Sequence, residues 1–274
     1  MSARIARHTA LLVAVAFFII PTYYIVLSSF KTKTDILGDP LGIPWANLTL
    51  ANYTNVFTQA QFSIVSAIQL SAAFAFLTAV GVVIFGSALS YVVARMRAPW
   101  GDRLFLFLFL GLIVPPQVVV IPVVKVLAAV GLLHTFYGLV LYEIGLDIPF
   151  ATFVYAGFIR TVPRELDEAA EIDGAGRIQT FVRVIFPLII PATASLFTII
   201  FIWTWNDFIN PLTVLGSSGG FTVTTGVYRS LGIYQQNWGA IFANIVVATG
   251  PMVVMYMFMQ RFIVGGLTGG AVKG

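Results

Sequence analysis

Long apolar runs, separated by a few clustered charges, constrain this chain more than any other feature. Hydrophobic residues make up 59% of the 274 positions, and charged residues only 9%. A soluble domain carries about a quarter charged residues, and a water-soluble fold of this length has no means of covering so much apolar surface. Lipid removes that constraint, because apolar side chains then face outward. We therefore expect an all-α membrane protein with several spans.

Six runs are long enough to cross a bilayer, which takes about 20 apolar residues each. The second run exceeds that length, so its helix tilts or begins outside the membrane. The fourth run is the least hydrophobic, and the polar stretch 31–61 is expected to be a loop. Neither a long linker nor an internal repeat is visible, which predicts one domain over residues 1–274. The expected spans are 9–29, 63–94, 104–129, 136–159, 188–209 and 240–262.

The positions of Lys and Arg predict the orientation, because cytoplasmic segments carry an excess of both. With a cytoplasmic amino terminus, the outer side holds only Lys31, Lys33, Lys125 and Arg229. Both termini are then cytoplasmic, which requires an even number of spans. The first run is too long for a signal peptide and no small-residue cleavage site follows it, so we expect it to be retained. The cytoplasmic positions are Arg4, Arg7, Arg95, Arg97, Arg103, Arg160, Arg164, Arg177, Arg183, Arg261 and Lys273.

Several chemistries are excluded by residues that the sequence lacks. Without Cys there are no disulfides, thiol nucleophiles or thiolate metal sites. No G-x-x-x-x-G-K-[ST] loop occurs, so the chain cannot hydrolyse ATP by that route. His8 and His134 are far apart and have no clustered ligand partners. We expect no catalytic residue, metal or cofactor in this chain, and we assign its net charge of +4 to membrane topology rather than to nucleic-acid binding.

The polar segment at about 160–187 predicts two short helices. Pro163 suits a first helical turn, and Gly174 is a natural stop. Leu166, Ala169, Ala170 and Asp173 recur at helical spacing and share one face, and Glu165, Glu168 and Glu171 lie on the neighbouring face. A second helix, at about 177–186, leads to Pro187. From the residues alone, a simple connector and a docking site for a partner are equally well supported.

This segment resembles the coupling motif of bacterial ATP-binding-cassette (ABC) importer permeases. That motif runs Glu-Ala-Ala, then Asp-Gly-Ala, then apolar residues and Pro. Val184 and Phe186 stand where the family more often has Ile and Leu, and both are apolar. In the family, the first helix docks into a cleft of the ATPase subunit and transmits its motion. The resemblance assigns ATPase coupling to Glu168, Ala169, Ala170, Asp173, Gly174, Ala175 and Pro187.

Other segments carry the same resemblance. Pro115-Pro116-Gln117 and the stretch 205–212 look like parts of sugar-importer permeases. The tail at about 263–274 is similar to that of the second of two permeases in maltose-type and glycerol-phosphate-type importers, where it reaches the ATPase interface. We expect the segment 266–274 to be too polar and glycine-rich to span the membrane or to pack as a helix. The tail residues implied in ATPase contact are Gly266, Thr268, Gly270 and Lys273.

The resemblance implies a type I ABC importer permease fold with six spans in a bacterial plasma (inner) membrane. The chain would form half of the pathway for a sugar or oligosaccharide and work by alternating access. The implied partners are a homologous first permease in a heterodimer, two ATPase subunits that bind ATP and Mg²⁺, an external solute-binding protein, and membrane lipid. A polyol, glycerol phosphate or another small solute is the alternative cargo, because nothing in the chain fixes the choice.

Polar residues within the spans are candidates for the substrate path, because charge in lipid is costly. Glu143 and Asp147 lie one turn apart and point the same way. Either they face a water-filled cavity or are protonated, or else they lie near the outer surface and hydrogen-bond to neighbouring helices. Aromatic rings suit sugar faces and polar groups suit hydroxyls, although Trp203 and Trp205 also fit an interfacial aromatic belt, which we favour for Trp205. Pro115 and Pro116 break a helix and either line the path or form a kink. The path candidates are Glu143, Asp147, Gln117, Trp203, Asn206 and Asp207.

A secondary transporter that uses Glu143 and Asp147 for protons or sodium is the main rival from another class. It would move ions without an ATPase, and the coupling motif argues against it. A membrane enzyme is a further alternative, but no nucleophile, metal site or acid–base pair supports one.

Overall fold

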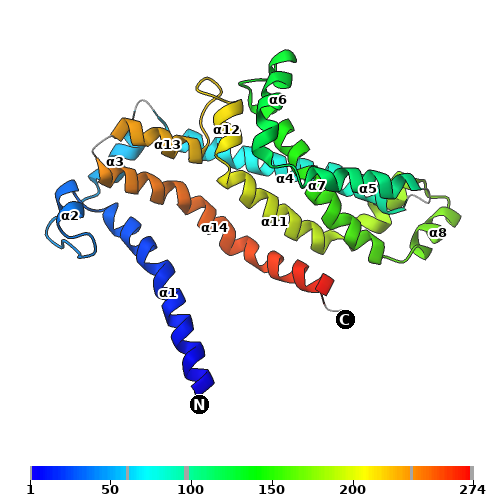
Figure 1. The fold of residues 1–274 in the computed structure, drawn as a ribbon, viewed down its shortest axis with the longest axis horizontal. Coiled ribbons are helices and arrows are strands. Elements are labelled where there is room, and N and C mark those ends of the chain that lie inside the picture. The colour runs from blue at the N-terminus through cyan, green and yellow to red at the C-terminus, as the bar shows by residue number, and fades with distance from the viewer. Residues whose placement is uncertain (1, 60–61, 96–98, 235–236, 272–274) are drawn as a thin grey trace. The chain divides into compact units, whose positions relative to one another are not determined.

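The computed structural model describes residues 2–59, 62–95, 99–234 and 237–271, and this part of the chain consists of helices joined by turns and loops, with no β-strand (Figure 1). It forms two compact units, Met1–Ile68 with Val223–Val253, and Gln69–Thr222 with Val254–Gly274. The all-α prediction is therefore confirmed. The helices α4 (Ile64–Arg95) and α14 (Trp238–Ala271) each contribute to both units.

Three helices of the described chain are long and apolar enough to cross a membrane, and they lie in α4, α7 (Phe136–Thr161) and α14. The number rises to five if each of two sharply bent helix pairs counts as one span. Val15–Ser28 adds a shorter apolar helix, within α1 (Ser2–Ser28). Each predicted run is thus mainly helical, while the count of six spans stays a prediction. The fourth run has the lowest mean hydropathy of the three long helices, as expected.

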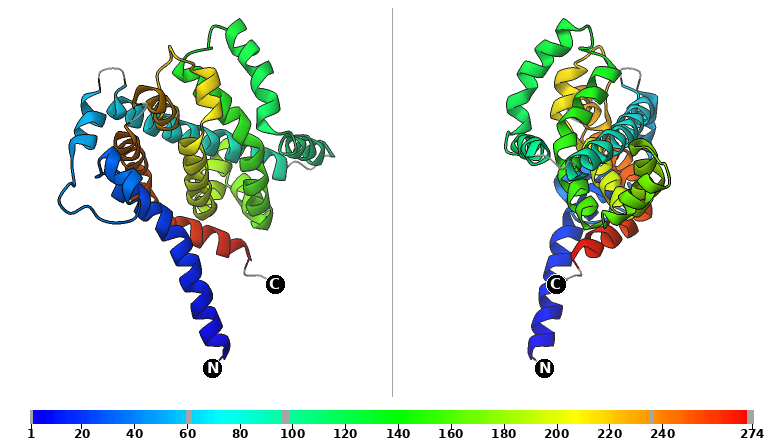
Figure 2. Two further views of the ribbon diagram at one scale, coloured as in Figure 1. Left: turned by 60° about the vertical axis from the view of Figure 1, so that its left-hand side comes forward. Right: turned by 90° about the vertical axis from the view of Figure 1, so that its right-hand side faces the viewer.

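The third predicted run is two helices rather than one straight span. α5 (Pro99–Gly111) and α6 (Pro116–Ala129) meet at 99° (Figure 2). Pro115 is the residue before α6 and Pro116 is its first residue, so the two missing N–H groups prevent the helix from continuing. The break that the sequence predicted here is confirmed, and it is a near right angle.

The fifth predicted run also begins at a bend. The helical segment Arg177–Leu188 meets α11 (Ile190–Asn206) at 80°. That segment comprises α9, a π-helical turn η1 and α10, so the predicted second helix is confirmed. Pro187 cannot donate a backbone hydrogen bond. The π-helical turn η1 ends two residues before it, with a wider bond from the Phe186 N–H to the Phe181 carbonyl. The bounds are α9 Arg177–Thr180, η1 Phe181–Ile185 and α10 Phe186–Leu188.

Within the second unit, α7 is the central element. α5 and α11 both pack along it, and α12 (Ile209–Val214) packs against α6 and α7 (Figure 1). Tyr155 and Ile159 of α7 are fully buried, as is Ile200 of α11. The result is a packed helical core built around α7.

The first unit contains helices that the sequence did not predict. The stretch expected to be a loop contains α2 (Lys33–Gly38) and α3 (Ala51–Thr58), and α13 (Val223–Tyr234) belongs to the same unit. The buried Lys31 ammonium donates to the carbonyls of Asp39 (2.7 Å) and Pro40 (3.2 Å). Such short helices depend on tertiary contacts of this kind rather than on local propensity.

Candidate functional site

One cavity of 360 Å³ brings together all six residues predicted for the substrate path. Its walls come from the start of α6, from α7, from the end of α11 and from α12. Sequence spacing placed only Glu143 and Asp147 side by side, and the fold adds the others. We call this the acidic cavity, and it is lined by Pro116, Gln117, Glu143, Leu146, Asp147, Ile202, Trp203, Asn206, Asp207, Ile209 and Asn210.

The carboxylates of the acidic cavity differ in their partners. Glu143 is buried and accepts a hydrogen bond from the Asn210 side-chain amide at 3.0 Å. Asp207 follows the last residue of α11 and accepts from the Ile209 backbone N–H at 3.2 Å. Asp147 is only 9% exposed, and its Oδ2 has no hydrogen-bond partner among the described residues. Glu143 therefore lines a cavity and also bonds to a neighbouring helix.

The two tryptophans near the end of α11 occupy different environments. Trp203 is about half exposed, lines the acidic cavity and packs on Phe150, with ring centroids 4.8 Å apart. Trp205 is buried and stacks on Phe201 at 6.1 Å. Because its ring is enclosed by protein, the expectation that Trp205 belongs to an interfacial aromatic belt is wrong.

A second cavity, of 640 Å³, is lined in part by the predicted coupling segment. It lies between the end of α4, the helix α8 (Glu165–Ile172) and the start of the segment Arg177–Leu188. Unlike the first cavity, it is lined by charges of both signs. We call it the α8 cavity, and its lining residues are Ala88, Tyr91, Val92, Arg95, Arg164, Asp167, Glu168, Glu171, Ala175, Gly176, Arg177, Ile178, Thr180 and Phe181.

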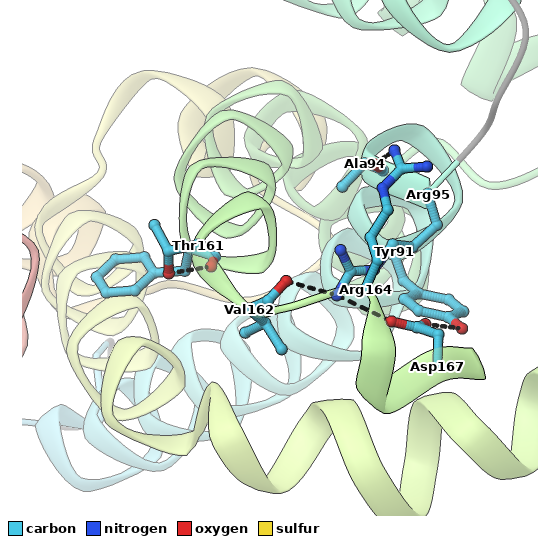
Figure 3. Close-up of polar contacts among 8 residues, drawn as sticks. Tyr91, Ala94, Arg95, Thr161, Val162, Arg164 and Asp167 are labelled. Atoms are coloured by element: carbon cyan, nitrogen blue, oxygen red, sulfur yellow. Dashed lines mark hydrogen bonds and ion pairs between the residues drawn. The ribbon is translucent and has the colours of Figure 1, made fainter. Parts of the chain in front are cut away.

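Asp167 ties α8 to the end of α4 (Figure 3). Its carboxylate forms an ion pair with Arg95 at 3.0 Å and accepts a hydrogen bond from the Tyr91 hydroxyl at 2.8 Å. The Arg95 guanidinium also donates to the carbonyl of Val162 at 3.1 Å, just before α8. One arginine thus holds both the helix and the chain that enters it. The side chains of Arg95 and Asp167 are 12% and 20% exposed, so solvent screens this pair only in part.

The predicted stop at Gly174 is confirmed by its geometry. α8 ends at Ile172, and Gly174 has a φ of +81°. The Gly174 N–H donates to the Glu171 carbonyl at 3.0 Å, and the Ala175 N–H donates to the Ala170 carbonyl at 2.9 Å. This pair of bonds is the Schellman motif, which glycine suits because it lacks a Cβ. Pro163 lies two residues before α8 rather than in its first turn.

The remaining residues of the predicted motif separate into buried and exposed positions. Ala170 is buried within the chain, so its side chain is not exposed to a partner. Glu168, Ala169 and Asp173 are exposed. Nearby, Ile172 and Ile178 are 87% and 81% exposed, which leaves two apolar side chains facing outward beside the acidic positions.

The predicted tail residues follow the last predicted span in the sequence. The backbone is helical to Ala271, so α14 includes Gly266, Thr268 and Gly270. A long apolar helix that precedes them propagates with little cost per added residue. The expectation that the segment 266–274 neither spans the membrane nor packs as a helix stays a prediction. Lys273 lies outside the described residues.

Sequence reasoning missed the residues that complete each site. Asn210 pairs with Glu143 across 67 positions, and Asp167 pairs with Arg95 across 72 positions. Neither pair follows from local spacing. The available signals were a lone Arg at the end of a 32-residue apolar helix, and an Asn that interrupts apolar sequence.

Comparison with known proteins identifies the family. Residues 86–268 match the family described as binding-protein-dependent transport system inner membrane component. The chain belongs to this family and is a membrane-embedded permease subunit of the ABC importer class. The resemblance that the sequence motifs carried is therefore confirmed.

Curated relatives match almost end to end. The multiple sugar-binding transport system permease protein MsmG of Streptococcus mutans is 32% identical over 97% of this chain and 96% of its own length. The trehalose transport system permease protein SugB of Mycobacterium tuberculosis is 33% identical over the full length of both chains. The melibiose/raffinose/stachyose import permease protein MelC of Bacillus subtilis is 31% identical over 100% of this chain and 98% of its own.

A solved structure has the same fold. A chain of a bacterial ABC transporter that imports the acidic polysaccharide alginate superposes with a TM-score of 0.79, over 94% of this chain and 95% of that one. At 18% identity, this likeness establishes the fold, which is the predicted type I importer permease fold.

Proposed function

We propose that this chain forms half of the translocation pathway for a neutral sugar or oligosaccharide. The names of its relatives support a sugar cargo, because permeases for multiple sugars, trehalose and melibiose/raffinose/stachyose match over nearly the whole chain. The acidic cavity supports the same cargo, because it combines a half-exposed tryptophan with amide and carboxylate side chains. Such a set suits both the faces and the hydroxyls of a sugar ring.

The arrangement of α8 is the observation that carries the proposed mechanism. Asp167, Arg95 and Tyr91 fix one side of the helix to α4, and the Schellman motif fixes its end. The helix also presents exposed carboxylates, with Glu168 among them, and Ile172 and Ile178 are exposed as well. A rigidly held helix with an acidic and apolar outer face suits docking to a separate basic partner, to which it transmits displacement.

We assign the partner of α8 as an ATPase subunit, in two copies, that binds ATP and Mg²⁺, since this chain lacks a phosphate-binding loop. A homologous first permease completes the pathway as a heterodimer, and an external solute-binding protein delivers the cargo. Both termini lie in the cytoplasm, which the Lys and Arg distribution supports. The coupling residues are Glu168, Ala169, Asp173, Gly174 and Ala175, with Ala170 and Pro187 shaping the segment from within. The tail from Gly266 onward contacts the same ATPase.

Charge reversal on α8 tests this mechanism. Glu168→Lys is expected to reduce cargo-stimulated ATP hydrolysis by the assembled importer at least tenfold, because losing one member of a desolvated interfacial charge pair costs about 2–5 kcal/mol. Co-purification of the ATPase with the variant distinguishes two causes of lost hydrolysis. Lost binding means a docking defect, and retained binding means a coupling defect.

Glu165→Lys is the matched control, with the same charge change on the same helix at another exposed position. We expect a smaller effect there, because Glu165 lies outside both the motif and the α8 cavity. Full activity of Glu168→Lys would reduce α8 to a simple connector and remove the main support for the mechanism.

A further inference from the structure

The acidic cavity has an unusual charge composition for a site open to solute. Three of its lining residues, Glu143, Asp147 and Asp207, bear carboxyl groups. No Lys, Arg or His lines the cavity within the part of the chain that the structure describes. The carboxyl groups come from two segments, α7 and the end of α11, so the cluster is a product of the fold rather than of one acidic stretch.

The burial of Asp147, and the missing partner of its Oδ2, are a second and independent feature of the acidic cavity. Its side chain is more than nine-tenths buried, and its Oδ2 has no hydrogen-bond partner among the described residues. Leaving a buried acceptor unsatisfied costs about 1–3 kcal/mol. Glu143, one turn earlier, accepts from Asn210, so the local structure satisfies one of the two α7 carboxylates and leaves Oδ2 of the other without a donor from the described residues.

The other lining residues indicate which class of ligand suits the acidic cavity. No group of three or more His, Cys, Asp or Glu among the described residues is arranged to hold a metal ion. Trp203 adds an aromatic surface, and Gln117 and Asn206 add amides that donate as well as accept. Hydroxyl and ammonium groups on an organic ring fit this lining better than a bare cation does.

We propose that the acidic cavity selects cargo by charge, admitting saccharides that are neutral or carry an ammonium group and excluding those that carry a carboxylate or phosphate. The inference rests on the proposed function. A narrow site lined by one sign of charge concentrates ions of the opposite sign by about 10- to 1000-fold and depletes those of the same sign. Cargo with a negative charge therefore meets repulsion from up to three carboxylates and finds no cationic lining residue to offset it.

The absence of Cys allows a test that needs no knowledge of the cargo. Gln117→Cys places one thiol at an exposed position in the cavity lining, and Ser218→Cys places one in an exposed turn elsewhere. Each full-length variant in detergent is reacted with two methanethiosulfonate reagents of similar size, one bearing trimethylammonium and one bearing sulfonate. We expect the ratio of cationic to anionic rates to be at least about tenfold higher at Gln117→Cys.

Neutralising Asp147 identifies the source of the preference. Asp147→Asn, added to Gln117→Cys, is expected to lower the rate ratio several-fold. Glu165→Gln, which removes one negative charge from α8 outside the cavity, is expected to leave the ratio unchanged. Equal ratios at Gln117→Cys and Ser218→Cys would overturn the inference. Absence of reaction with either reagent at Gln117→Cys would also overturn it, because the cavity is then closed to ions of both signs.

Labelling is measured without transport or ATP, so its failure leaves the proposed function standing. Conversely, normal activity of Glu168→Lys would defeat the coupling mechanism and leave the labelling result intact. In the reconstituted importer, Asp147→Asn is also expected to raise uptake of a uronate-bearing saccharide relative to its neutral parent several-fold. An unchanged uptake ratio would show that the cavity does not select cargo.

Discussion

The acidic cavity and the α8 cavity use carboxylates in opposite ways. In the α8 cavity, Asp167 has two partners from α4, an ion pair with Arg95 and a hydrogen bond from Tyr91. In the acidic cavity, Asp147 is more deeply buried and its Oδ2 has no partner among the described residues. Both lie in the same compact unit.

The difference separates positioning from binding. A carboxylate that is already paired fixes the backbone that carries it, and its removal exposes its partner to the cost of an uncompensated charge. A carboxylate without a partner costs stability in the resting chain and repays that cost when a ligand supplies the donor. Substitutions in the α8 cavity should therefore reduce stability more than those in the acidic cavity. Substitutions in the acidic cavity should mainly change transport.

Asp167→Ala is expected to have the largest effect on stability. Removing Asp167 leaves the mostly buried Arg95 without its ion-pair partner and Tyr91 without its acceptor. We expect a loss of about 1–3 kcal/mol, together with faster proteolysis of the segment that contains α8. Thermal unfolding of the purified chain and limited proteolysis measure the two effects.

Asp102→Ala is the matched control for that experiment. Asp102 also pairs with an arginine, Arg160, but at 3.4 Å and with side chains 88% and 45% exposed. An exposed pair of this kind contributes little, so the unfolding temperature should stay close to that of the parent chain. Equal losses in both variants would mean that burial does not distinguish the two pairs.

Gly174→Val is expected to have an intermediate effect, confined to the end of α8. A side chain added here meets no atom within 4 Å, so the cost is conformational and arises from the φ of +81°. That cost is about 1–2 kcal/mol for a residue with a Cβ, and higher for a branched one. Gly176→Val, with φ of −74° and equally open space, should cost less, because it disturbs only the N-cap of α9 and strains no left-handed turn. Comparable destabilisation at both positions would contradict the assignment of strain to the left-handed turn.

Asp147→Ala is expected to have the smallest effect on stability and a clear effect on transport. Because Oδ2 already lacks a partner, its loss should leave the unfolding temperature equal or slightly raised. Uptake or cargo preference should change several-fold at normal membrane levels of the subunit. Unchanged uptake with unchanged levels would return Asp147 to a purely structural role.

Local rules predicted what lies within one element. Helical periodicity placed Glu143 and Asp147 on one face, paired prolines predicted the break before Gln117, and Gly174 predicted the end of α8. In each case the decisive physics, a missing N–H or a permitted φ, belongs to the residue itself.

Side-chain contacts between different helices could not be predicted from these local patterns. Arg95 counted in the sequence only as one positive charge near a membrane boundary, whereas the fold makes it the anchor of α8. Trp205 is a tryptophan near the end of a predicted span, which is typical of an interfacial residue, but packing against Phe201 buries it. The partner of a side chain many residues away depends on how helices pack, which no single-segment pattern encodes.

The π-helical turn η1 bears on how the length of this chain can change during evolution. A π turn holds one residue more than the α-helical turn it replaces. Deleting one residue from Phe181–Ile185 would convert the turn to α-helix and leave α9 and α10 facing as they do now. The same deletion within α8 would rotate everything after it by about 100°, because each residue of an α-helix turns by that amount. Single-residue gaps among homologous permeases should therefore collect at η1 and avoid α8.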